Sequence, residues 1–198
     1  MGQGSENIML ILSSPSGVGK TTLTKKIQQK YPNFKISVSH TTRTPRSNEV
    51  DGVDYNFVSH EKFKELIVEK KFYEYAKIFE NYYGTLKQNV DEAIKYNDIL
   101  FDIDWQGTKQ LSKFKNLNLI KIYLITDKVE LKKRLIKRNQ NTKKEIEKRY
   151  KSFDDEIKHW VDYDYIVINN NLETCFKQIE NIILLNKTKN SISSLTSQ

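Results

Sequence analysis

A turn of small residues followed by a lysine and two threonines is the first segment that could do chemistry. Ser14 to Thr21 fits the phosphate-binding pattern G-x-x-x-x-G-K-[ST], with Ser14 in place of the opening glycine. Small residues let backbone N–H groups curl around a phosphate, and the following helix adds its positive dipole. A chance turn ahead of a helix is the alternative. The sequence predicts a triphosphate-binding loop of Ser14, Ser16, Gly17, Val18, Gly19, Lys20, Thr21 and Thr22.

Two carboxylates lie at the end of another apolar run, where a metal-bound nucleotide would need them. Asp102 and Asp104 follow Ile99, Leu100 and Phe101, so they face the crevice at the carboxyl edge of a sheet. We expect Lys20 to contact the β- and γ-phosphates. Thr21, together with Asp102 through water, is expected to hold the Mg²⁺ of Mg-ATP. An ion pair, or the capping of a helix that starts at Trp105, is the structural alternative for the two aspartates.

These candidates lie between elements that alternate along the chain. Apolar runs at 8–12, 36–38, 99–104, 120–125 and 165–168 predict strands. Helical spacing predicts helices over 23–31, 131–135, 146–160 and 172–183, the third of them long, with Tyr150, Phe153 and Trp160 in the core. Such alternation predicts a parallel α/β sheet with right-handed crossovers. The segment from about 37 to 89, with strands expected within 72–85, interrupts the alternation and is predicted to be an inserted subdomain.

The composition is that of a folded protein with a basic surface. Of 198 residues, 37% are hydrophobic and 29% charged, and the formal net charge is +8. These values exclude a disordered chain and favour a polyanionic partner. The lone Cys175 excludes an internal disulfide framework, and the run at 8–12 is too short for a membrane span. We therefore expect a cytoplasmic protein that does not act at a membrane.

Three further segments carry a family resemblance. The segment from Ser37 to Tyr55, which contains T-T-R-T-P-R, resembles the GMP-binding signature of the guanylate kinases. Glu74 followed by Asn81 to Thr85 is similar to another part of it, and Asp102 to Gly107 resembles the family's D-x-D-x-Q-G. The resemblance runs from about residue 8 to residue 185. It implies a P-loop nucleoside monophosphate kinase fold: a core with a five-stranded parallel sheet, an inserted mixed α+β GMP-binding subdomain and a short lid.

The resemblance also implies domain bounds. The core comprises 1–36 and 96–187, with a lid at about 137–150, and the GMP-binding insert with its return helix spans 37–95. The Ser/Thr/Asn-rich tail, 188–198, is expected to be frayed and flexible.

By the same resemblance, the insert would hold one mononucleotide. Arg43, Arg46, Tyr55 and Tyr83 would surround the GMP phosphate, as two guanidinium forks and two phenols are suited to do. Glu74 would accept the N1–H and N2–H₂ of guanine. A solvated turn is the alternative for the arginines, and a surface charge on an alternating strand is the alternative for Glu74. The predicted GMP site is completed by Ser39 and Thr85, which would donate to guanine O6, and by Asp104.

The donor side would use the basic run. Residues 132–151 contain 10 Lys or Arg and two Glu. Arg134, Arg138 and Arg149 match the family's lid arginines, which together with Lys20 form the predicted catalytic set. The remaining lysines are most simply a solvated face. Asn169 matches the family's loop beside the ATP adenine, with capping of the last helix as the alternative.

The sequence thus predicts an enzyme that transfers the γ-phosphate of ATP to GMP, and by extension to dGMP. A catalytically silent, protein-binding guanylate-kinase-like module is the second hypothesis, although such modules erode the phosphate loop that this chain retains. Nucleic-acid binding is the third, suggested by the isoelectric point near 9.3. Because the basic run lies where a lid belongs and lacks interleaved exposed aromatics, we expect no nucleic-acid partner.

Overall fold

The apolar run after the N-terminus forms the centre of the core sheet. The computed structural model describes residues 7–78, 80–137 and 143–196. In it, β1 (Met9–Ser13) is wholly buried and pairs in parallel with β7 (Asp98–Asp102) and β8 (Leu119–Ile125). The outer strands are β2 (Phe34–Ile36) and β9 (Tyr165–Ile168), giving the order β2-β7-β1-β8-β9. The predicted five-stranded parallel α/β sheet is confirmed.

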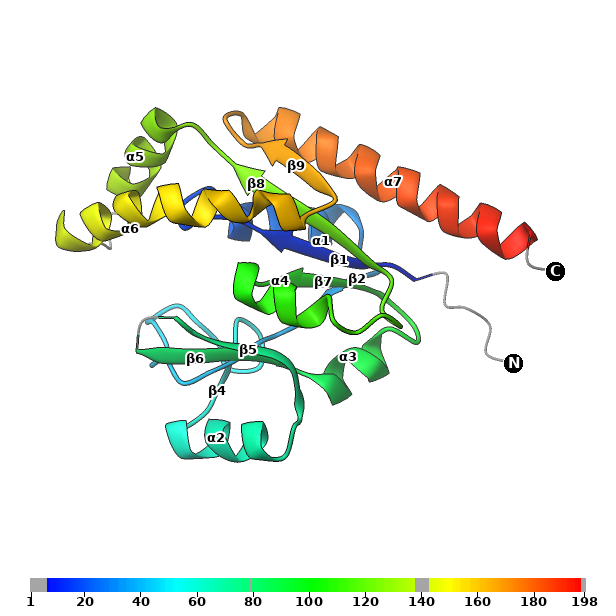
Figure 1. The fold of residues 1–198 in the computed structure, drawn as a ribbon, viewed down its shortest axis with the longest axis horizontal. Helices are drawn as coiled ribbons and strands as arrows, with labels where there is room; N and C mark the ends of the chain where they lie inside the picture. The colour runs from blue at the N-terminus through cyan, green and yellow to red at the C-terminus, as the bar shows by residue number, and fades with distance from the viewer. Residues whose placement is uncertain (1–6, 79, 138–142, 197–198) are drawn as a thin grey trace.

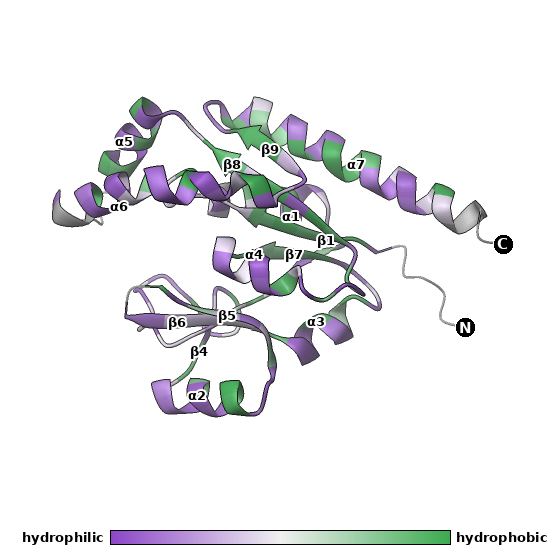
Figure 2. Ribbon diagram, viewed as in Figure 1, coloured by the Kyte–Doolittle hydropathy of each residue, from purple (hydrophilic) through white to green (hydrophobic). Residues whose placement is uncertain are grey.

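Helices cover both faces of this sheet (Figure 1). Leu10 and Leu12 point into one core cluster, and Met9 and Ile11 point into the other, because neighbouring strand residues face opposite ways. Figure 2 shows the core strands as predominantly hydrophobic and the helices as mixed. The first cluster is covered by α1 (Lys20–Lys30), α5 (Lys128–Lys137), α6 (Lys143–Glu156) and α7 (Leu172–Thr196), and the second by α3 (Lys87–Ala93) and α4 (Trp105–Leu111).

A second, four-stranded sheet lies below the core in Figure 1. Its order is β4-β3-β6-β5, from β3 (His40–Thr41), β4 (Asn56–Phe57), β5 (Phe72–Ile78) and β6 (Asn81–Leu86). The amphipathic helix α2 (His60–Val68) buries Phe63, which stacks on Phe72 with ring centroids 4.6 Å apart. All of these elements fall within the predicted insert, and the strands expected within 72–85 are confirmed.

The long helix predicted over 146–160 is shorter than expected. α6 ends at Glu156, and a 3₁₀ helix, η1 (Ile157–Asp162), follows it. Phe153 is buried as predicted, but Trp160 is 46% exposed, so its assignment to the core is wrong. The tighter 3₁₀ turn rotates the residues after Glu156 away from the α-helical stripe.

The C-terminal segment is more ordered than the sequence predicts. Residues 188–196 continue α7 to Thr196, so the expectation of a frayed tail is wrong for them. Along this last part of α7, Thr188, Ser191 and Ser193 each donate a side-chain hydrogen bond to the carbonyl four residues earlier. Among the described residues, no helix combines the length and apolar character of a membrane span.

A buried aspartate joins the start and the end of the chain. The side chain of Asp98 is 1% exposed. It accepts hydrogen bonds from the Ile8 backbone N–H at 2.9 Å and Asn33 Nδ2 at 3.1 Å. Lys187 Nζ, on α7, lies 2.5 Å from Oδ2, the same oxygen that accepts from Asn33, whereas Ile8 donates to Oδ1. A buried carboxylate with three donors is stable only while they all remain in place.

Asp98→Ala should therefore lower the free energy of unfolding by about 1–3 kcal/mol, because it leaves the buried N–H of Ile8 without an acceptor and removes the partner of the 39% exposed Lys187. Urea unfolding followed by circular dichroism measures this loss. Glu173→Ala is the matched control, since it breaks an ion pair with Lys26 in which Glu173 is 73% exposed. Its cost should stay below about 1 kcal/mol. Equal losses in the two variants would contradict the role assigned to Asp98.

Candidate active site

A cleft of about 560 Å³ opens between the core and the insert. Its core side is the loop between β1 and α1, and its opposite side comes from β5, from β6 and from the segments on either side of β3 in the insert. The C-terminal end of β7 forms the floor, and α6 contributes a further wall. The cleft brings together Ser14, Ser16, Gly17, Gly19, Lys20, Thr21, Ser39, Arg43, Arg46, Tyr55, Glu74, Tyr83, Asp102, Asp104 and Arg149.

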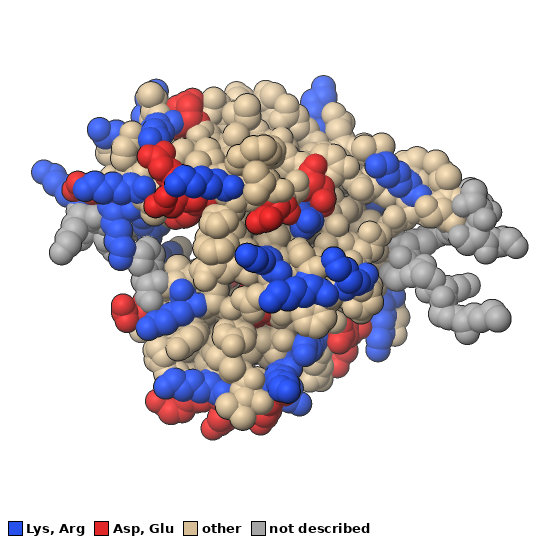
Figure 3. Space-filling view, in the orientation of Figure 1, with Lys and Arg blue, Asp and Glu red and all other residues tan. Residues whose placement is uncertain are grey.

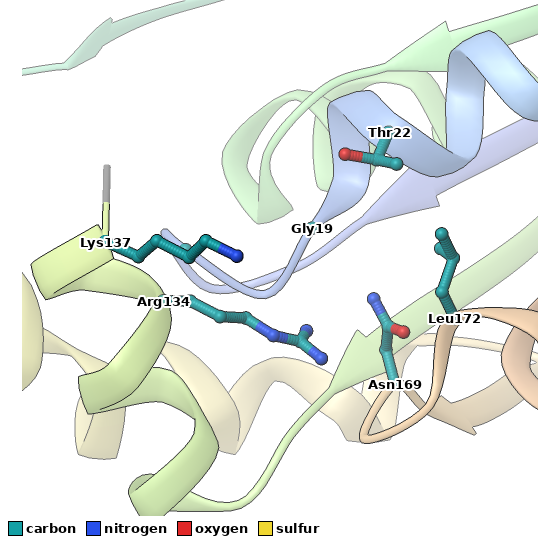
Figure 4. Close-up of a pocket in the computed structure, with 7 residues that line it drawn as sticks. Gly19, Thr22, Arg134, Lys137, Asn169 and Leu172 are labelled. Atoms are coloured by element: carbon teal, nitrogen blue, oxygen red, sulfur yellow. The ribbon is translucent and has the colours of Figure 1, made fainter. Parts of the chain in front are cut away.

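A second cavity, of about 320 Å³, adjoins the loop and shares Gly17 and Gly19 with the cleft. Figure 4 shows Arg134 and Lys137 reaching toward the loop from α5, with Asn169 opposite them. Arg134 Nη1 donates to the Val18 carbonyl at 2.8 Å, and Asn169 Nδ2 donates to the same oxygen at 2.7 Å. Both predicted donor-side residues thus brace the loop. Val18 itself is buried, and Thr22 and Leu172 complete the lining of this cavity.

Two glycines give the loop its shape. Gly17 has φ +93° and Gly19 has φ +107°, values that side chains with a Cβ rarely adopt. A Cβ on Gly19 would also lie 2.8 Å from Asn169 Nδ2. Ser14 needs no such freedom, because Lys70 is the only non-glycine residue with positive φ in the described part of the chain. This explains why serine fits where the phosphate-loop pattern has its first glycine.

The Lys20 ammonium lies among carboxylates. It forms an ion pair with Asp102, so the ion-pair alternative for that aspartate is found in this structure. Burial lowers the pKa of Lys20 to about 8, against the nearby charges of Asp104 and Glu74, which raise it. The helix-capping alternative is found for Asp104, since its Oδ1 accepts the Gly107 N–H at 3.0 Å and caps α4. While making these contacts, Lys20, Asp102 and Asp104 all still line the cleft.

The two arginines of the insert share one acid that the sequence analysis missed. Arg43 Nη2 donates to Glu49 Oε1 at 2.8 Å, and the Arg46 backbone N–H donates to Glu49 Oε2 at 2.9 Å. The Arg43 side chain is only 17% exposed, so the alternative of a solvated turn is wrong for it. Its guanidinium carbon lies 5.3 Å from the centre of the Tyr55 ring, and Tyr55 packs edge-on against Tyr83. Arg46, whose side chain is 57% exposed, lines the same cleft.

Glu74 is the deepest acid of the insert side. It is 4% exposed, so the alternative of a surface charge is wrong. Burial raises its pKa to about 7, and the charge of Asp104 adds to this, while the charge of Lys20 opposes it. Thr85 is its cross-strand neighbour and is fully buried. A Cβ on Gly107 would lie 2.6 Å from Glu74 Oε2, so the start of α4 and this carboxylate share a contact that only glycine permits.

Helix α6 adds residues that the sequence analysis did not identify. Arg149, a predicted lid arginine, donates from Nη1 to Ser16 Oγ at 3.0 Å. Glu156 accepts the Ser16 backbone N–H at 3.0 Å, and it lines the cleft with Trp105 and Gln106. The spacing of seven residues between Arg149 and Glu156 was the available signal. The third predicted arginine, Arg138, lies outside the described residues.

The loop before α7 shows both of the roles considered for its asparagines. Asn171 Oδ1 accepts the Thr174 backbone N–H at 3.0 Å, as a helix cap does. Asn169 instead points its amide at the phosphate-type loop, and its Oδ1 is a buried atom with no hydrogen-bond partner in the described part of the chain. Capping of α7 therefore belongs to Asn171 and not to Asn169.

Comparison with known proteins decides the family. A model of the family described as "Guanylate kinase" matches residues 6–185 of this chain. The chain belongs to the guanylate kinase family. It is 42% identical to the guanylate kinase of Paramagnetospirillum magneticum, with 92% of this chain and 86% of that protein aligned. The Rickettsia prowazekii guanylate kinase is 43% identical over 94% of this chain and 95% of its own length.

A solved structure supports the same family. The guanylate kinase from Anaplasma phagocytophilum superposes with a TM-score of 0.75 at 31% identity, covering 91% of this chain and 86% of that one. The family resemblance predicted from the insert and the D-x-D-x-Q-G segment is therefore confirmed. The chain is an enzyme of the guanylate kinase family.

The buried acid of this enzyme should make stability depend on pH. The pKa of Glu74 is about 7 in the folded protein against an ordinary value of 4.5, so folding favours its neutral form. Its contribution is full below about pH 4.5 and is lost as the pH rises through 7. Urea unfolding gives the free energy of unfolding of Glu74→Gln minus that of the parent, and this difference should be more favourable to the variant at pH 8 than at pH 5 by about 3 kcal/mol. A difference that is the same at both pH values would contradict the raised pKa.

Proposed function

We propose that this guanylate kinase transfers the γ-phosphate of ATP to GMP or dGMP, with the residues of the cleft in the roles given below. The single observation that carries the assignment is the cleft itself, which has a phosphate-type loop on one side and a buried acid with two arginines on the other. Neither side alone specifies the reaction. Together they provide places for a donor triphosphate and an acceptor monophosphate across one opening.

On the donor side, the loop Ser14 to Thr22 takes the triphosphate. Gly17 and Gly19 expose the backbone N–H groups, and Lys20 supplies the charge for the β- and γ-phosphates. Asn169 and Arg134 flank the adjoining cavity, where the rest of the ATP molecule would lie. The unpartnered Oδ1 of Asn169 is suited to accept a hydrogen bond from the adenine amino group.

The donor side also fits a Mg²⁺ ion carried by ATP. Thr21 and Asp102 line the cleft together, and one hydroxyl and one water-linked carboxylate suit an ion that brings phosphate ligands of its own. Within the described ranges, no group of three His, Cys, Asp or Glu side chains forms a self-sufficient metal site. When bound, the ion would neutralise charge on the phosphates.

On the acceptor side, the insert takes GMP. Arg43, Arg46, Tyr55 and Tyr83 hold its phosphate, and Glu49 keeps the two arginines in place. Glu74 accepts the two N–H groups of the guanine edge. Adenine offers an acceptor nitrogen there, so it would leave the buried carboxylate unpaired, a costly arrangement. Ser39, Thr85 and Asp104 complete the base site, with Thr85 buried beside Glu74.

The transfer needs positioning and charge more than proton removal. The second pKa of a phosphate monoester is about 6, so the attacking GMP oxygen is ionised at neutral pH without a general base. Lys20, Arg134 and Arg149 supply positive charge where it accumulates during an in-line displacement, and the matching Arg138 joins this set. Closure of the cleft must exclude water, which would otherwise accept the γ-phosphate.

The basic surface does not require a nucleic-acid partner. Figure 3 shows Lys and Arg on α5 and α6 mixed with acidic side chains. Lys128 pairs with Asp154, and Lys151 pairs with Glu147. This interspersed pattern is that of a solvated helix face. We place the enzyme in the cytoplasm, where its nucleotide substrates are found, with no membrane partner.

Lys20→Ala tests the donor side. The variant should lose at least about 100-fold in kcat, because it removes a charge that the transferring phosphates need, while its far-UV circular dichroism stays that of the parent. A coupled assay with ATP and GMP measures turnover. Lys25→Ala, exposed on the same helix, is the matched control and should turn over like the parent. Near-normal turnover of the Lys20 variant would remove the phosphate-loop assignment.

Glu74→Gln tests base choice. The amide has the same shape but cannot accept both guanine N–H groups as a carboxylate does. We expect kcat/KM for GMP to fall by about 2–4 kcal/mol in transition-state terms. AMP should gain relative to GMP, because the amide is able to donate to adenine N1.

The assay compares GMP with AMP at saturating ATP, and it uses Glu69→Gln, an exposed acid of the insert, as control. A parent that phosphorylates neither nucleotide would contradict the proposed function. An active parent whose GMP/AMP ratio does not move in Glu74→Gln would leave phosphotransfer standing but remove Glu74 as the base reader.

A further inference from the structure

One residue of the phosphate-type loop is held twice by helix α6. The Ser16 backbone N–H donates to Glu156 Oε2 at 3.0 Å, and Ser16 Oγ accepts from Arg149 Nη1 at 3.0 Å. Arg149 and Glu156 are seven residues apart, which is about two turns of α-helix, so they share one face of it. Ser16 therefore joins the loop to a helix that carries a catalytic arginine.

Glu156 contacts the loop from the end of α6, which is anchored to the core sheet. It is the last residue of α6, and its backbone carbonyl accepts the Tyr123 hydroxyl at 2.6 Å. Tyr123 lies on β8 in the centre of the sheet and is 1% exposed. Burial raises the pKa of Tyr123, so its hydroxyl stays a donor throughout the working pH range. Phe153, one turn earlier, is buried in the core cluster beneath the helix.

The contact is chemically unusual because the loop otherwise suits anions. Pro15 has no N–H, so Ser16 supplies the first backbone donor after Ser14. Farther along, Arg134 and Asn169 hold the loop by the Val18 carbonyl. The loop is thus held through an N–H at its entrance and through a carbonyl near its middle. Of the side chains that hold the loop in these two ways, Glu156 is the acidic one.

We infer that Glu156 is a positioning residue for phosphoryl transfer, fixing Ser16 so that the loop entrance and the Arg149 guanidinium face the transferring phosphate together. Glu156 acts through its reach to the Ser16 N–H rather than through its negative charge. The inference rests on the proposed function, since it assigns a task to the same cleft. It adds a residue that makes no contact with substrate in that proposal.

Three substitutions separate reach from charge. Glu156→Gln keeps an acceptor oxygen at the same distance, Glu156→Asp keeps the charge but is one methylene shorter, and Glu156→Ala loses both. We expect kcat to fall about 10- to 100-fold in the Asp and Ala variants, because a displacement on the order of 1 Å in a catalytic array has effects of that size. The Gln variant should lose no more than about threefold. KM for GMP should change less than about threefold in all of them.

Asp155→Ala is the matched control, since it removes an acid from the neighbouring position whose side chain is 83% exposed. Binding of ADP, followed by calorimetry, should stay within about threefold of the parent for every Glu156 variant, because the Gly17–Thr21 part of the loop is untouched. Ser16→Ala should lower kcat as well. Combined with Glu156→Ala, it should lower kcat by less than the product of the single losses, because both act at one junction.

The outcomes are distinguishable. A parent without ATP:GMP phosphotransfer refutes the proposed function. An active parent with Glu156→Ala matching Asp155→Ala refutes only the role of Glu156. If Glu156→Ala does not fold, the Asp and Gln variants decide. A slow Gln variant beside an active Asp variant would mean that the negative charge matters. Equal kcat values in the two variants would mean that the length of the side chain does not matter. Either result overturns the inference.

Discussion

The Lys20 ammonium sits where the two halves of the cleft meet, and the rest of the site depends on how its charge is balanced. Asp102 pairs with it directly, and the charges of Asp104 and Glu74 also act on it. Three carboxylates near an anion-binding loop would repel a triphosphate on their own. A buried cation between them reduces that repulsion, because charges interact strongly where little water separates them. The loop and the acids are compatible only because the sheet brings Lys20 between them.

The core sheet provides this arrangement through the register of two neighbouring strands. β1 delivers the loop at its carboxyl end, and the adjacent β7 delivers Asp102 at the same edge, with Leu12 opposite Asp102 in the ladder. The insert then closes the opposite side through β5, which carries Glu74 and contacts α4. In this enzyme of the guanylate kinase family, the strand that carries Glu74 thus packs on α4, and α4 in turn contacts β1, the strand that leads into the loop.

Local patterns predicted the parts of the site that lie close together in sequence. The loop from Ser14 to Thr21 and the core strands followed from spacing and apolar runs. The burial of Glu74 did not, because alternation gives the face of a strand but not its depth. A register shift between Phe72 and Glu74 also makes three successive residues of β5 buried. The family resemblance supplied what periodicity lacked.

The remaining differences have similar physical causes. Glu49 and Glu156 look like ordinary surface acids in the sequence, and only the tertiary fold brings them to Arg43 and Ser16. Trp160 fits an α-helical stripe, but α6 gives way to a 3₁₀ helix after Glu156, whose carbonyl accepts a hydrogen bond from Tyr123 of β8. Residues 188–196 continue α7 although they lack the apolar spacing on which the prediction of helices relied.

The close approach of Gly107 to Glu74 has a consequence for how such an enzyme can diverge. The position is at once the capped start of a core helix and the wall behind the Glu74 carboxylate. Even a methyl group at position 107 would require the Glu74 carboxylate or α4 to move. A lineage in which this position gains a side chain must therefore also reposition Glu74, so the two positions are expected to change together.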